Sequence, residues 1–168
     1  STGGLTRMTE AKRELAWASA SELALWLRSR KLSPVELMAA TIERIEARNP
    51  SLNALVFTDF DHAMAAARRA EAELMAGKPL GPLFGLPTAI KDLFDYKPGW
   101  PATLGGVRAL ADWRPDLRCL FTERVEAAGG LVLGKTNNPR RGFRGGTDKY
   151  LFGPPPTPSS PPRQPRRP

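Results

Sequence analysis

The chain has 168 residues, of which 41% are hydrophobic and 25% are charged, the balance of an ordinary soluble domain with one core. It has no run of 18 apolar residues, as a transmembrane helix would need, and residues 1–8 lead into no apolar stretch of a secretory signal peptide. The single cysteine, Cys119, excludes an internal disulfide and a zinc site built mainly from cysteines. We therefore expect a cytoplasmic protein with no membrane partner.

The net charge of +8 raises the question of a nucleic-acid partner. The basic excess lies late in the chain, around residues 140–144 and 163–167. It lacks the series of interleaved aromatic residues on which bases could stack. A nucleic-acid partner is therefore not favoured.

Two helices are predicted in the first fifty residues. Ser19 and Glu22 have the spacing of a capping box and open the first helix. Residues 33–36 give a stronger start signal, with Ser at the N-cap, Pro in the first turn and Glu at the third position. We expect this second helix to stop before Pro50, because proline disrupts a helix interior.

The remaining predicted elements alternate between strands and helices: strand 53–58, helix 61–76, strand 86–90, loop 97–101, helix 116–128 and strand 131–133. Asp61 and Asp116 are expected to cap the two helices. Leu117 and Phe121 are expected on the buried face of the second one. The order favours an α/β layer architecture.

The composition changes after Gly153, where eight of the last 15 residues are proline. Proline lacks an N–H group, so this segment is expected to be extended and mobile. Residues 162–167 also show the PxxPxR spacing of a polyproline ligand for an SH3-like groove, a match that arises readily by composition.

The apolar stretch 86–90 leads directly into Lys91. A lysine at the end of a buried strand can be held partly desolvated, so that it loses its proton and acts as a general base. The alternative is a lysine that simply ends a strand in water. Asp92 and Asp95 either orient Lys91 or finish the strand.

Three blocks of sequence, one of which contains Lys91, resemble the amidase signature family in order and spacing. They are GPLFGLPTAIKDLFD at 81–95, GGLVLGKTN at 129–137, and GFRGGTD followed by YLFGP within 142–154. The resemblance covers about residues 17–154. It implies an α/β/α fold with helices flanking a mixed sheet. It also implies that amides are hydrolysed or transferred through a Ser–cis-Ser–Lys triad, in which Lys91 matches the lysine that serves the bridging serine.

The resemblance does not reach the two serines. The family continues past its Phe-Gly-Pro segment into a Gly/Ser-rich loop that holds the bridging serine. Six of the eight serines here lie within residues 1–51, and Ser159 and Ser160 lie among prolines, which have no N–H groups for an oxyanion hole. We therefore assign only Lys91 as catalytic, expect the chain alone to be inactive, and interpret the tail as a truncated or out-of-frame end.

Two further patterns are weaker. Residues 129–136 fit the Walker A motif, but they follow a predicted helix and contain a predicted strand, so a helix–Gly–strand junction is the better interpretation. His62 lies beside Asp59 and Asp61, and the first turn of a helix explains it better than a metal site. Cys119 is expected to be buried within its helix rather than reactive.

The sequence thus predicts an N-terminal extension at 1–16, a partial amidase-like domain at 17–153 and a Pro/Arg-rich disordered tail at 154–168. The fold class is α/β, with leading helices and part of a mixed sheet. The expected function is hydrolysis of carboxamide C–N bonds, with no cofactor or metal, on a small-molecule amide in the full-length form. A free amidase, a subunit of a larger enzyme such as a tRNA-dependent amidotransferase, and a homo-oligomer all stay open. So do a non-catalytic binding module that recruits a partner through the tail, and a partly unfolded remnant.

Overall fold

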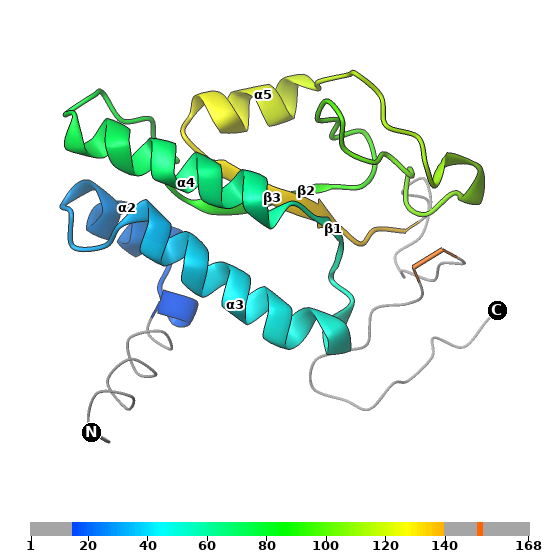
Figure 1. Cartoon of the computed structure of the whole chain (residues 1–168), viewed down its shortest axis with the longest axis horizontal. Helices are drawn as coiled ribbons and strands as arrows, with labels where there is room; N and C mark the ends of the chain where they lie inside the picture. The colour runs from blue at the N-terminus through cyan, green and yellow to red at the C-terminus, as the bar shows by residue number, and fades with distance from the viewer. Residues whose placement is uncertain (1–14, 140–150, 153–168) are drawn as a thin grey trace.

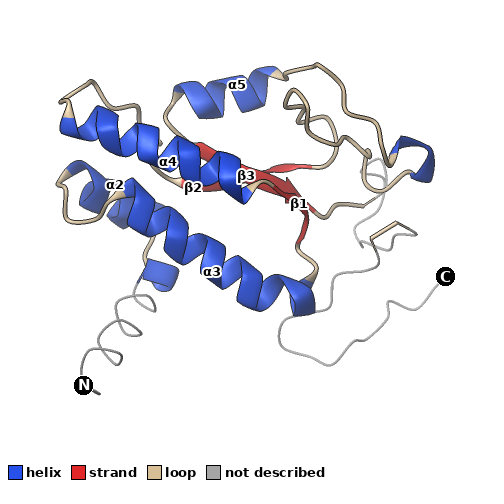
Figure 2. Ribbon diagram, in the orientation of Figure 1, coloured by secondary structure: helices blue, strands red, loops and turns tan. Residues whose placement is uncertain are grey.

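The computed structural model describes residues 15–139 and 151–152 (Figure 1). Its elements, in chain order, are α2 (Ala20–Arg28), α3 (Pro34–Leu52), β1 (Leu55–Thr58), α4 (Phe60–Met75), β2 (Pro87–Lys91), η1 (Arg108–Leu110), α5 (Leu120–Ala127) and β3 (Leu131–Thr136). Figure 2 shows the three strands side by side, with α3 and α4 lying along them.

The strands form a mixed sheet in the order β1-β3-β2. The central strand β3 runs antiparallel to β1 and parallel to β2. The connection from β2 to β3 passes through η1 and α5, since parallel strands need a long crossover. The α/β class and the mixed sheet predicted from the sequence are thereby confirmed.

The first two helix starts also match the prediction. Ser19 and Ser33 are the N-caps of α2 and α3, and each forms a reciprocal capping box with the glutamate three residues later. Each box satisfies backbone N–H groups that would otherwise lack a partner in the first turn.

Three predicted boundaries are wrong. Helix α3 passes through Pro50 and ends at Leu52, because a proline in the last turn removes a single backbone bond and Asn53 then closes the helix in the left-handed conformation (φ 48°). Asp59, not Asp61, caps α4 and accepts a hydrogen bond from the His62 N–H (3.0 Å). Asp61 instead lies in the first turn, where its charge suits the helix dipole.

Helix α5 begins four residues later than predicted. Its N-cap is Cys119, whose sulfur accepts from the Thr122 N–H (3.4 Å), rather than Asp116. The Cys119 N–H donates to the Tyr96 carbonyl (3.3 Å), which holds the preceding segment in an extended course. Leu117 and Phe121 consequently face solvent, not the core as predicted, and Cys119 is half-buried.

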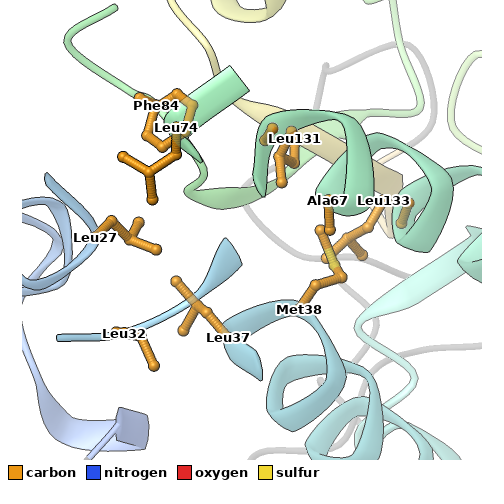
Figure 3. Packing of buried hydrophobic residues seen from close by; sticks show 11 residues of the cluster. Leu27, Leu32, Leu37, Met38, Ala67, Leu74, Phe84, Leu131 and Leu133 are labelled. Atoms are coloured by element: carbon orange, nitrogen blue, oxygen red, sulfur yellow. The ribbon is translucent and has the colours of Figure 1, made fainter. Parts of the chain in front are cut away.

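The core lies on both faces of the sheet. Residues Leu131 and Leu133 of β3 pack with α2, α3 and α4, where Leu27, Leu37 and Met38 are buried (Figure 3). Between them in sequence, Val132 packs on the opposite face with Ile90 and Trp100, against the partly buried Val125 of α5. Alternation along one strand therefore joins two apolar layers.

A β-bulge in β3 changes this alternation before the strand ends. Val132 pairs with Thr88 and Gly134 pairs with Ala89, so Leu133 is an extra residue with no partner on β2. Gly134 is required at the close approach of β1, because a Cβ there would lie 2.4 Å from the Phe57 carbonyl oxygen. After the bulge, Lys135 pairs with Ile90 and Phe57, so it shares their face rather than that of Leu133.

Candidate active site

The carboxyl ends of the two parallel strands meet at one edge of the sheet. Lys91 is the last residue of β2 and pairs with Thr136, the last residue of β3. In open α/β sheets, ligands bind beyond the carboxyl ends of parallel strands. The predicted catalytic lysine therefore lies at the edge where a site is expected.

The side chain of Lys91 is exposed in this chain. Its backbone N–H donates to a carboxylate oxygen of Asp95 (2.9 Å), so Asp95 fixes the turn after the strand. The Lys91 ammonium group makes no hydrogen bond or ion pair within residues 15–139 and 151–152. The desolvation expected for Lys91 is therefore not found in this chain.

A second lysine, Lys135 of β3, is the buried one. Only 1% of it is exposed, and its ammonium group donates to the Pro101 carbonyl (2.9 Å) and lies 3.5 Å from a carboxylate oxygen of Asp92. Burial lowers the pKa of Lys135 below its ordinary value, although the Asp92 carboxylate opposes the shift. Asp92 is also buried, so the two charges form an ion pair inside the protein.

Asp92 in turn organises the loop that follows Lys91. One of its carboxylate oxygens accepts from the Thr103 N–H (2.9 Å) and the other from the Thr103 hydroxyl. Its carbonyl accepts from the Gly105 N–H (2.6 Å), and the Thr103 hydroxyl oxygen accepts from the Gly106 N–H (2.8 Å). Loop 92–106 is therefore tied to both parallel strands, next to Lys91. Of the two options for Asp92, the contacts favour the structural one.

The sequence analysis missed this network. A signal for it exists, because Lys135 interrupts an otherwise apolar strand and a charge in such a place requires a partner. The Walker A spacing drew attention to Lys135 for a different reason. The structure confirms the helix–Gly–strand junction there: the motif follows α5 and its centre is β3, whose N–H groups serve the sheet.

Four of the N-terminal serines have local partners. Ser19 and Ser33 cap helices, the Ser29 hydroxyl donates to the Trp26 carbonyl (3.2 Å), and the Ser51 hydroxyl donates to the Arg48 carbonyl (2.9 Å). These contacts match their prediction as caps and turns. Ser159 and Ser160, like the proline-rich tail, lie outside the described residues.

His62 packs edge-on against the Trp100 ring, with 5.9 Å between ring centroids. Burial, and then the nearby Lys97 ammonium, lower the pKa of His62. Within the described part of the chain, no group of three or more His, Cys, Asp or Glu side chains could hold a metal ion. None of the helices in that part has both the length and the apolar character needed to cross a bilayer.

The class that fold and site define is an α/β segment with a lysine at the carboxyl edge of a parallel strand pair. The family described as Amidase matches residues 36–165. An acylamidase of Rhodococcus erythropolis is 43% identical over 147 residues, which are 88% of this chain and 30% of that protein. A glutamyl-tRNA(Gln) amidotransferase subunit of Acidothermus cellulolyticus is 37% identical over 141 residues, 84% of this chain and 28% of that protein.

Solved structures agree with these sequence matches. A bacterial aryl acylamidase of the amidase signature family superposes with a TM-score of 0.81 at 44% identity, over 84% of this chain and 29% of that enzyme. The chain belongs to the amidase signature family. It spans about 30% of the length of the curated relatives it matches.

Proposed function

We propose that this chain contributes the lysine of a Ser–cis-Ser–Lys site that hydrolyses carboxamide C–N bonds, with Lys91 as the base. The supporting observation is the position of Lys91 at the carboxyl edge of β2 and β3, inside the segment shared with acylamidases. Its ammonium group has no competing ion pair among the described residues, so it is available to a hydroxyl brought next to it.

Lys135 is not a second candidate for the base. Its nitrogen is held by Asp92 and the Pro101 carbonyl and is closed off from solvent, so no substrate or serine can reach it. The contacts of Lys135 instead support a structural role beneath the loop that follows Lys91.

The proposed reaction divides the work between this chain and further amidase polypeptide. A neutral Lys91 accepts a proton from the bridging serine, which accepts one from the nucleophilic serine as that oxygen attacks the amide carbon. The amine then leaves with a proton and water hydrolyses the acyl-serine. Because neither serine matches a position in this chain, we propose that the chain alone does not turn over.

The first test is hydrolysis of a chromogenic anilide by the purified 168-residue chain. We expect no release of the aniline above the buffer blank. Robust hydrolysis that disappears in Lys91→Met would contradict the proposed inactivity.

The second test supplies the serines. Residues 17–139 of this chain replace the matching segment of the R. erythropolis acylamidase, and we expect the chimera to hydrolyse the anilide. Lys91→Met should reduce kcat about 10³-fold or more, as loss of one member of a catalytic triad does. Lys91→Arg should fail as well, because a guanidinium does not give up its proton near neutral pH. Lys31→Met, on an exposed turn, is the matched control. Equal activity in Lys91→Met and Lys31→Met would rule out Lys91 as the base.

The relatives leave two forms of the active protein, a free acylamidase or one component of an amidotransferase. The alternative of a non-catalytic module that uses residues 154–168 stays a prediction, as does a cytoplasmic location. A pull-down with and without residues 154–168 tests that alternative, and identical partner sets would count against the tail.

A further inference from the structure

Five large apolar side chains are exposed on the segments that follow β2 and lead into α5. The exposed fractions are 62% for Phe94, 37% for Trp113, 50% for Leu117, 60% for Leu120 and 57% for Phe121. We call these five residues the 94–121 face. Charged groups usually cover the solvent side of a surface helix, whereas the first turn of α5 presents Leu120 and Phe121.

Contacts between the segments make this one surface rather than scattered residues. The Tyr96 and Trp113 rings pack edge-to-face with 5.9 Å between centroids, and the Tyr96 carbonyl accepts from the Cys119 N–H. The Trp113 carbonyl accepts from the Ala102 N–H (3.0 Å). Figure 1 shows the loop after β2 lying beside the start of α5. Single exposed apolar residues are ordinary, but a contiguous group marks an interaction site.

The 94–121 face adjoins the candidate active site. Phe94 follows Lys91 by three residues, in the turn that Asp95 holds. The neighbouring strand β2 pairs only with β3 among the described residues, so its outer edge offers backbone groups to a further strand. A partner seated here would therefore cover apolar side chains, a strand edge and the exposed Lys91 together.

The lengths of the relatives indicate what this partner is. The matched segment makes up 28–30% of the acylamidase and of the amidotransferase protein, so about two thirds of each relative is additional polypeptide. We propose that the 94–121 face docks the rest of an amidase fold, the part that carries the two serines, and that docking buries Lys91. The docking rests on membership of the family, and the burial of Lys91 links it to the proposed function.

Docking also resolves the exposure of Lys91. A lysine fully in water stays protonated near neutral pH and cannot accept a proton from serine. Removal from water disfavours the charged form, so the same contact that buries the 94–121 face makes Lys91 a better base.

The test co-expresses the full 168-residue chain with a tagged polypeptide consisting of the acylamidase residues that this chain does not match. We expect the two to co-purify in a 1:1 complex. Leu120→Glu and Phe121→Glu should each weaken the complex about tenfold or more, because each places a charge in a buried apolar contact. Met75→Glu is the matched control, since Met75 is equally exposed (66%) but lies at the end of α4.

Each outcome is decisive. Soluble partner recovered with the wild-type and Met75→Glu chains, but not with Leu120→Glu, supports the proposal. Equal recovery with all chains, or insolubility with all of them, overturns it. A homodimer that Leu120→Glu dissociates, or a complex that forms only after deletion of residues 154–168, would identify a second copy or the tail as the occupant and also overturns it.

Reactivity of Lys91 toward an amine reagent separates this inference from the proposed function. We expect labelling of Lys91 to fall several-fold in the complex, while labelling of the exposed Lys78 is unchanged. A complex that protects Lys91 yet hydrolyses no anilide would leave the docking intact and refute the catalytic proposal. Hydrolysis without protection of Lys91 would do the reverse.

Discussion

Lys91 and Lys135 end neighbouring strands, yet their surroundings give them opposite properties. Lys135 follows the bulge in β3, which turns it onto the face of Ile90 and Trp100, where Asp92 and the Pro101 carbonyl receive its charge. Lys91 ends β2 in solvent. A buried ammonium group with fixed partners holds structure, whereas an exposed one at a strand end is free to meet a substrate or a partner.

We predict that Lys135→Met destabilises the chain by about 3–5 kcal/mol, because it leaves the buried Asp92 carboxylate without its counter-charge. The double variant Lys135→Met/Asp92→Asn should recover part of this loss. Lys78→Met, which breaks an exposed pair with Glu73, should cost less than about 1 kcal/mol. Urea unfolding followed by circular dichroism measures all three. Equal effects of Lys135→Met and Lys78→Met would show that the buried pair contributes no more than a surface pair.

We predict an acid-sensitive contribution from His62. Its pKa is lowered in the folded state by burial and by Lys97, so the unfolded chain binds more protons as the pH falls below about 6.5. The stability that neutral His62 contributes is therefore complete above the unfolded value and is lost as the pH falls through the lowered folded value. The gap in unfolding free energy between wild type and His62→Gln should shrink from about pH 7.5 to about pH 5. A gap that widens with acid would mean that the folded pKa is raised instead.

At the scale of elements, local signals in the sequence located most helices and strands, but not their ends. Ser19 and Ser33 identified two helix starts because a capping box is complete within four residues. The start of α5 depends on the Cys119 bond to Tyr96, a contact from a distant loop that no local pattern contains. The Lys135–Asp92 pair was missed for the same reason. Its partners lie 43 positions apart and meet only after the sheet has formed.

The two capping boxes should differ in strength. Ser33 accepts from the Val35 and Glu36 N–H groups and also donates to Glu71 of α4, so Ser33→Ala removes a cap and a link between helices. We expect a cost of about 1–2 kcal/mol. Ser19→Ala removes a solvent-exposed box within α2 alone and should cost about 0.5–1 kcal/mol. Urea melts of both variants would compare them, and a larger loss at Ser19 would argue against the contribution of Glu71.

At the scale of the molecule, β3 is the element that both core layers share. Leu131 and Leu133 pack under α3 and α4, and Val132 packs beneath α5. Neither layer can lose its packing without exposing the other face of the same strand. The helices and the α5 side should therefore unfold together, even though the sheet has only three strands within the described residues.

We therefore predict one cooperative urea transition, with coincident curves from far-ultraviolet circular dichroism, which follows the helices, and near-ultraviolet circular dichroism, which follows buried aromatic residues such as Trp100. Leu133→Ala and Ile90→Ala, on opposite faces of the sheet, should each lower the free energy of unfolding by about 2–5 kcal/mol and shift both curves equally. Leu25→Ala, at an exposed position of α2, should change it by less than about 0.5 kcal/mol. Curves that separate, or a Leu133→Ala shift seen only in the far ultraviolet, would mean that the layers unfold independently, as a partly unfolded remnant would.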